Sequence, residues 1–280
     1  MRDDERFDFT PGIPYHQIGV LAIFPFEEAR PMLRKALPGL VLAAFLAAPA
    51  AAQTVDEVIA KSFEARGGLD KLKAVQAVRM TGKMTMGPTE LPIVIETKRP
   101  ASIRLDVTVQ GTLAVQAYDG TTGWAISPMG TGQAERVPPE VAKRMADQAD
   151  MDGPLVDHKA KGHQVELLGR EKVEGSDAFK LKVTRKGGDV EYYFLDAKSW
   201  LPVRVEGRQT VRGTEIEGEG TIGDYKEVAG FLWPHSIQNG AKGRPEKQTI
   251  TIEKIEINPT IDDSRFRMPA AKPAEPPKKD

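Results

Sequence analysis

Beyond residue 76 the chain alternates between apolar and polar positions with the period of a β-strand. Residues 102–109 are typical: one face of the expected strand is polar, and the other carries Ile103, Leu105, Val107 and Val109. Such alternation indicates a strand with one buried face. About a dozen strands are expected, separated by turns such as Asp119-Gly120. Their segments are residues 77–85, 91–99, 102–109, 113–118, 124–127, 179–184, 190–195, 202–211, 214–225, 231–239 and 247–258.

Three other segments have helical spacing. The first, over residues 54–67, has Thr54 as its N-cap and Glu57 in the capping-box position; its apolar stripe comprises Val55, Val58, Ile59, Ser62 and Phe63. A short second helix is expected over residues 69–75. The third, over residues 137–150, opens with two prolines and has only a thin apolar stripe. This helix is inserted between the two runs of strands.

The last expected strand changes its alternation partway along. Ile250 and Ile252 share one parity, whereas Ile255 and Ile257 have the other. A bulge or bend near residues 253–254 would allow this change, and such bends let a sheet curl. The chain has no alternating βα units. The predicted fold class is therefore mainly β with α (α+β), built on a long, curved antiparallel sheet around helices.

Residues 32–52 have the three parts of a secretory signal peptide. Arg34 and Lys35 supply positive charge, residues 36–48 form an apolar run, and a small-residue pattern ends at Ala52. The run is shorter than the about 20 residues of a membrane-spanning helix. We therefore predict cleavage after Ala52 and export of a soluble protein that works outside the cytoplasm.

The rest of the chain divides around this signal. Because signal peptides normally begin a chain, Met32 is the predicted start and residues 1–31 are a predicted non-native N-terminal extension. Residues 53–269 have a length suited to one domain. Residues 270–280 are rich in proline and charge, which predicts a disordered tail.

Cysteine content and net charge narrow the function classes. The chain has no cysteine, which excludes disulfides, thiol chemistry and a lipid anchor on cysteine. Its 39 basic side chains nearly balance its 40 acidic ones, and no basic stripe is evident. Nucleic acid is therefore not an expected partner.

Three stretches carry a family resemblance: YYFLDAKSWLPVRVE (192–206), GDYKEVAGFLWPHSI (223–237) and TITIEKIEINPTIDDSRFRMP (249–269). They resemble the outer-membrane lipoprotein-sorting (LolA-like) family of periplasmic proteins, within the LolA-LolB-LppX superfamily. The resemblance implies a half-open β-barrel of about eleven strands with a helical lid. It also implies a periplasmic, non-enzymatic carrier or chaperone for the acyl chain of a lipoprotein or another lipid. Inner- and outer-membrane proteins would then be its partners.

The same resemblance leaves a rival open. The fold also serves as an envelope sensor or protein-interaction module, and an enzyme-associated accessory domain is a third, weaker alternative. In the best-known carrier of the family, an arginine near the second strand holds the lid closed. Arg99 lies in roughly that region here, although no local motif aligns it.

Histidines and carboxylates are the candidates for site chemistry. Zinc needs three or four ligands with close pairs; His158 and His163 lie far from His235 in sequence, and exposed loop histidines are the favoured interpretation. Two acidic groups are not expected to act as acid/base pairs: Asp147, Asp150 and Asp152 near the end of the inserted helix, and Glu215, Glu217 and Glu219. The alternating glutamates are interpreted as a solvated strand face. The chain also lacks nucleophile and phosphate-binding motifs. We therefore predict no catalytic residue, metal or cofactor.

Apolar residues are the remaining candidates for a site. A curved sheet with a poorly apolar inserted helix is expected to leave room in its concavity, and flexible methionines suit varied acyl chains. For most of these residues, filling a closed core is the favoured interpretation. The predicted ligand-binding residues are Met84, Ile93, Ile95, Leu105, Val107, Val115, Trp124, Met145, Met151, Tyr193, Phe231 and Trp233.

Overall fold

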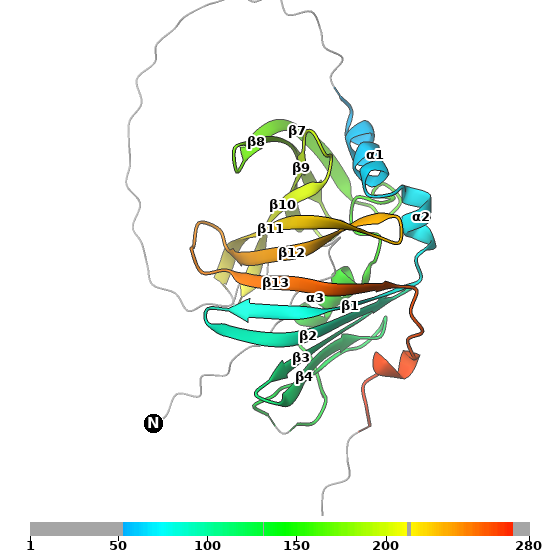
Figure 1. Ribbon diagram of the computed structural model, residues 1–280, viewed down its shortest axis with the longest axis vertical. Coiled ribbons are helices and arrows are strands. Elements are labelled where there is room, and N and C mark those ends of the chain that lie inside the picture. The colour runs from blue at the N-terminus through cyan, green and yellow to red at the C-terminus, as the bar shows by residue number, and fades with distance from the viewer. Residues whose placement is uncertain (1–52, 131, 212–213, 271–280) are drawn as a thin grey trace, which may run out of the picture.

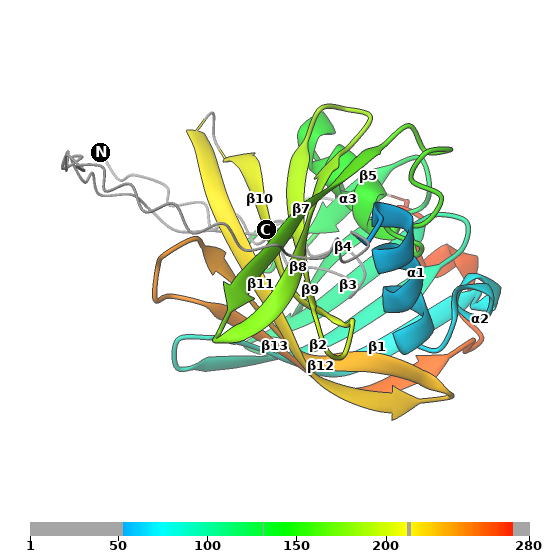
Figure 2. The same cartoon turned by 90° about the horizontal axis from the view of Figure 1, so that it is seen from above.

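A computed structural model describes residues 53–270, apart from 131 and 212–213. Within these residues, thirteen strands form one antiparallel sheet in the order β6-β5-β4-β3-β2-β1-β13-β12-β11-β10-β9-β8-β7 (Figure 1). Strands β6 and β7 end this order, so the sheet is not closed. It curls around one side (Figure 2), as the predicted fold class requires. The predicted extension (1–31), signal peptide (32–52) and tail beyond Ala270 lie outside the described residues.

Every segment expected from alternation is a strand. The strands are β1 (Ala77–Met86), β2 (Thr89–Lys98), β3 (Ser102–Val109), β4 (Thr112–Tyr118), β5 (Gly123–Ile126), β6 (Glu135–Arg136), β7 (Gln164–Val173), β8 (Ser176–Thr184), β9 (Val190–Asp196), β10 (Pro202–Val211), β11 (Thr214–Val228), β12 (Phe231–Ala241) and β13 (Gln248–Ile257). Strands β6 and β7 were not expected. The number of strands therefore exceeds the number that the family resemblance implied.

Three α-helices accompany the sheet, together with one 3₁₀ turn. They are α1 (Val55–Ala65), α2 (Leu69–Ala74), α3 (Pro139–Ala149) and η1 (Asp263–Arg265). Helix α1 begins as predicted, because the Thr54 hydroxyl accepts from the Glu57 backbone N–H and the Glu57 carboxylate accepts from the Thr54 backbone N–H. Its stripe is buried at Val58, Ile59, Ser62 and Phe63, and Val55 is half-buried. None of the helices in the described part of the chain is long and apolar enough to cross a membrane.

A bulge lies where β1 pairs with β13. Thr81 is opposite Lys254 and Gly82 is opposite Ile252, so Glu253 is an extra residue on β13. This confirms the bend predicted from the isoleucine parity. After the bulge, Ile255 and Ile257 face the same side as Ile250 and Ile252, and all four pack in the core on the concave face of the sheet.

The C-terminal segment covers the opposite, convex face over β1–β5. Glu96 is 2% exposed there and accepts from Arg79 at 2.8 Å and from Arg265 at 2.5 Å. Arg265 also binds Asp106 at 2.9 Å. Burial of these charges is tolerated because each one is paired and hydrogen-bonded. The network fastens residues 261–268 across the outside of the sheet.

Gly82 allows the close approach of strands at this bulge. A Cβ added to Gly82 would lie 2.0 Å from the Thr251 carbonyl oxygen, whereas one added to Gly223 would meet nothing within 4 Å. We expect Gly82→Ala to lower the free energy of unfolding by about 3 kcal/mol, because backbone must move. Gly223→Ala should change it by less than about 1 kcal/mol. Urea denaturation of both variants measures this; equal stabilities would contradict the role given to Gly82.

Candidate ligand-binding site

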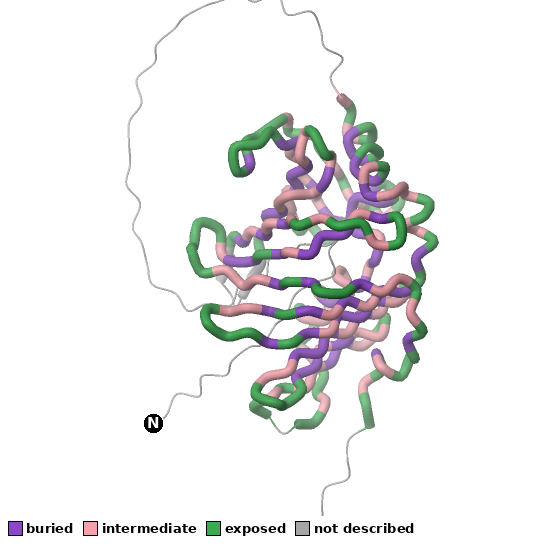
Figure 3. The backbone as a smooth tube through the Cα atoms, in the orientation of Figure 1, coloured by how far each residue is buried: buried purple, intermediate pink, exposed green. Residues whose placement is uncertain are grey.

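The concave face carries the main hydrophobic core. Most predicted ligand-binding residues belong to this core. Those of the strands are Met84, Ile93, Ile95, Leu105, Val107, Tyr193, Phe231 and Trp233, and Met151 packs against them from the covering segment 150–161. Figure 3 shows buried positions running along the middle of the strands. The sheet and its cover therefore place an apolar surface where the resemblance implies a ligand cavity.

Val115 and Trp124 do not join this group. They lie on the convex face, in a separate cluster with Ala117, and the Trp124 indole N–H donates to the Phe266 carbonyl at 2.7 Å. The C-terminal segment thus covers them. Met145 is buried on α3, but it does not belong to the main core.

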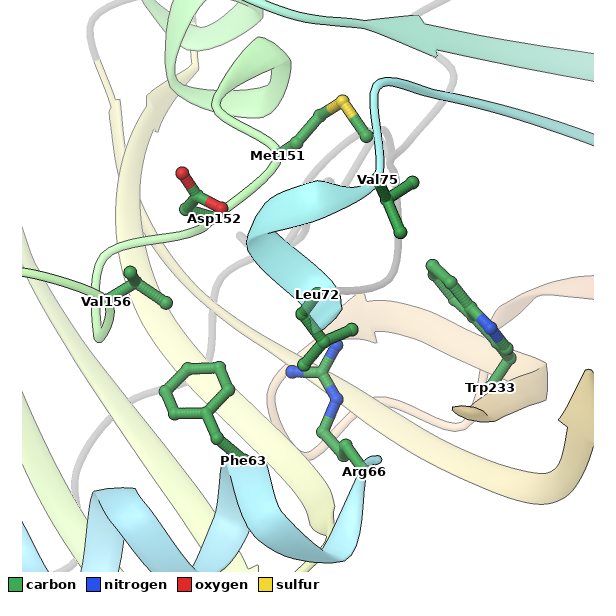
Figure 4. Close-up of a pocket in the computed structure, with 8 residues that line it drawn as sticks. All are labelled: Phe63, Arg66, Leu72, Val75, Met151, Asp152, Val156 and Trp233. Atoms are coloured by element: carbon green, nitrogen blue, oxygen red, sulfur yellow. The ribbon is translucent and has the colours of Figure 1, made fainter. Parts of the chain in front are cut away.

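Two small cavities lie between the concave face and its cover. One has a volume of about 20 Å³. It is lined by the residues shown in Figure 4: Phe63, Arg66, Leu72, Val75, Met151, Asp152, Val156 and Trp233. The second has the same volume and is lined partly by Phe63, Leu155 and Tyr193. Each has room for about one water molecule. Both cavities are too small for an acyl chain, so a long ligand at this place would require α1 or the segment 150–161 to move.

Arg99 ties this cover to the sheet. It follows β2, and its guanidinium donates two hydrogen bonds to the Asp152 carboxylate, at 2.6 and 2.8 Å. It also donates to the carbonyl of Val75 at 2.7 Å, directly after α2. The hydrogen bonds from Arg99 to Asp152 raise the pKa of Arg99 above its usual value. Arg99 therefore joins β2, α2 and the segment 150–161 at one point.

Further ionic contacts lie around the edge of the cover. Lys73 of α2 binds Asp157 at 2.7 Å, and Lys159 binds Asp56 of α1 at 2.8 Å. The hydrogen bond from Lys159 lowers the pKa of Asp56. Both pairs are largely exposed, and exposed pairs contribute at most about 1 kcal/mol each. They orient the cover more than they stabilise it.

The histidines differ from expectation. His158 is buried rather than exposed, with its Nε2 atom 3.4 Å from Asp56, because the segment 150–161 folds under α1. His235 is buried in β12, and its Nδ1 atom lies 3.0 Å from the Trp233 carbonyl. Burial lowers the pKa of His163. Among the described residues, no group of three His, Cys, Asp or Glu side chains is placed to hold a metal ion.

Helix α3 lies across the opening between the two ends of the sheet. It contacts β3, β4 and β5 on one side. On the other, Lys143 binds Asp189 at 2.6 Å and Asp147 lies 3.6 Å from Arg185, in the turn between β8 and β9. Burial raises the pKa of Asp147 above its usual value. The thin apolar stripe of α3 is thus supplemented by charge pairs at its exposed side.

A buried polar group lies near this turn. Arg185 donates to both oxygens of Glu191, at 3.2 and 3.1 Å, and the Tyr193 hydroxyl donates to Glu191 at 3.0 Å. Burial disfavours the charge of Arg185, yet the neighbouring carboxylate of Glu191 raises its pKa. Arg185 and Glu191 were not predicted from the sequence, because each looks like a polar position beside a glycine turn.

The predicted acidic faces have mixed surroundings. Asp150 and Asp152 form ion pairs with Lys161 and Arg99. Glu217 pairs with Arg208 at the surface, while Glu219 is partly buried and pairs with Arg204 and Lys247. These carboxylates are held by basic side chains.

The geometry defines a half-open antiparallel barrel whose concave apolar face lies under helices. No protein-family model and no curated protein matches the sequence. The structure is similar to a putative outer membrane lipoprotein-sorting protein domain from Vibrio parahaemolyticus, with a TM-score of 0.53 and 12% identity over 75% of this chain and 94% of that one. It is also similar to a LolA superfamily protein from Nitrosomonas europaea, with a TM-score of 0.52 and 14% identity over 77% and 98%. The protein has a LolA-like fold.

Removing either partner of the Arg99–Asp152 pair should loosen the cover. We expect Arg99→Ala and Asp152→Ala to show a coupling of about 1–2 kcal/mol in a double-mutant cycle, because the contact is bidentate and mostly buried. Denaturant unfolding of both single variants and the double variant measures the coupling. Additive effects of the two substitutions would contradict a direct contact. The pair Lys172 and Asp177, exposed on the β7–β8 hairpin, is the matched control and should show little coupling.

Proposed function

We propose that the protein is a periplasmic, non-enzymatic carrier that shields an acyl chain on the concave face of its half-barrel. The observation that carries the proposal is a continuous apolar face covered by small elements that are tied down at few points. The LolA-like fold supports it, since two of the similar structures bear lipoprotein-sorting or LolA names. The signal pattern of residues 32–52 supports an exported location.

The free energy gained by burying an acyl chain can offset the free energy lost when α1 leaves the concave face. Burial of an acyl chain gains about 0.8 kcal/mol per CH₂, or on the order of 10 kcal/mol for about 14 carbons. Opening α1 would expose Val58, Ile59 and Phe63, each at a cost of about 1.5–3 kcal/mol. The acyl chain can therefore replace the stripe of α1 on the concave face.

Locking the cover should block this exchange. The chain has no cysteine, so Lys73→Cys with Asp157→Cys provides a unique pair for a short bismaleimide cross-linker between α2 and the segment 150–161. We expect the cross-linked protein to lose uptake of a fluorescent fatty acid, and the untreated variant to keep it. Fluorescence titration measures both.

The matched control is a cross-link between Lys172→Cys and Asp177→Cys, which joins β7 to β8 and not to the cover. It should leave uptake unchanged. If the cover-locked protein takes up the fatty acid as well as the control does, movement of α2 against the segment 150–161 plays no part in binding.

Native mass spectrometry of protein purified from the periplasm tests the ligand directly. We expect a co-purifying lipid or lipoprotein, because the apolar gain on binding is large. An empty protein that instead captures an inner-membrane protein would favour the alternative, an envelope sensor. Denatured protein from the same preparation, which has lost the cavity, is the control.

A further inference from the structure

Asn239 is a buried polar residue on the concave face. It lies in β12 and is 1% exposed, and neither its Nδ2 nor its Oδ1 atom has a hydrogen-bond partner among the described residues. Two positions earlier, Ile237 packs in the main core. Because side chains of a strand alternate, Asn239 also faces the concavity. A buried amide without a partner is unfavourable, so its presence there calls for a ligand.

The strands on either side show where Asn239 lies in the concavity. It is in register with Gly220 of β11 and Gln248 of β13. The adjoining row toward α1 is wholly apolar and consists of Ile222, Ile237, Ile250, Met84 and Leu91. In the other direction Gly218 pairs with Ala241. Asn239 therefore marks the end of the apolar surface.

The length of that surface fits one acyl chain. The other end of β12 lies against α1, where the Leu232 N–H donates to the Arg66 carbonyl. From Trp233 to Asn239 the strand rises by about 20 Å. One leaflet of a bilayer's hydrocarbon core is about 15 Å thick. A chain with its methyl end near Trp233 would place its polar end at Asn239.

Charge at this end favours a neutral group. The amide of Asn239 is uncharged. In the adjoining loop between β12 and β13, Lys242 pairs with Glu206 and Lys247 pairs with Glu219. An ester or amide carbonyl needs only a donor, and the Nδ2 atom of Asn239 supplies one.

We propose that Asn239 donates a hydrogen bond to the ester or amide carbonyl of a bound acyl lipid, so that the protein selects acyl over alkyl chains. This proposal rests on the proposed carrier function and names its ligand class. The Oδ1 atom of Asn239 is left to accept from a neighbouring hydroxyl of the lipid.

Two lipids that differ only in the carbonyl test the proposal. They are 1-palmitoyl-lysophosphatidylcholine, an ester, and 1-O-hexadecyl-lysophosphatidylcholine, its ether analogue. By isothermal titration calorimetry we expect the unmodified protein to bind the ester about fivefold more tightly. In Asn239→Leu, an apolar side chain of similar size, the ratio should fall to about one while the ether lipid still binds. Gln238→Leu, an exposed position on the other face of β12, should keep the ratio.

The outcomes separate this inference from the carrier function. Binding of neither lipid to the unmodified protein would refute the carrier function. Equal binding of ester and ether would leave the carrier standing and overturn the role of Asn239, whose amide would then meet only water. A ratio that persists in Asn239→Leu would overturn it as well.

Thermal stability gives a second measurement without ligand. Because the amide of Asn239 is buried without a partner, Asn239→Leu should raise the Tm of the free protein by about 3 °C in scanning calorimetry. A Tm lowered by a similar amount would show that the amide is already satisfied inside the protein, and would count against the proposal.

Discussion

The pairing of β1 with β13 holds the structure together. Strands β1 to β6 form one meander and β7 to β13 another, and this one pairing joins them into a single sheet. The bulge at Glu253 and the absent side chain of Gly82 lie within it. Without the bulge, Ile255 and Ile257 would turn to the convex face, since a shift of one residue reverses the side that each position faces. The concave core therefore depends on the bulge.

The cover is held in a different way from the sheet. Strand pairing uses many hydrogen bonds, whereas α1, α2 and the segment 150–161 combine an apolar contact with a few charged ones. The apolar contact is non-directional, so another apolar surface can take its place. The charged contacts, of which Arg99 with Asp152 is the most buried, fix one orientation of the cover. Apolar residues thus attach the cover to the sheet, and charged residues fix its orientation.

Much of the fold could be predicted because alternation records burial on one face. The bulge was visible in the isoleucines of β13, and the capping box in Thr54 and Glu57. Strand β7 was missed because its charged edge sequence contains Gly169, at a bulge, and buries little. Val115 and Trp124 lie in strands that alternate as clearly as the strand of Val107, yet they face the convex side. Alternation shows that one face of a strand is buried. It does not show that the C-terminal segment, far away in sequence, buries the convex face. Asn239 was missed because a polar residue at the end of a strand resembles the start of a turn.

Helix α3 touches both ends of the curled sheet, through β3–β5 on one side and the β8–β9 turn on the other. Helix α3 therefore links the two ends of the half-barrel, and these ends cannot move apart unless those contacts break. In the proposed carrier, displacing α1 would therefore lengthen the space along the strands without widening it. The number of hydrocarbon chains that fit side by side would then be limited more strictly than the length of each chain.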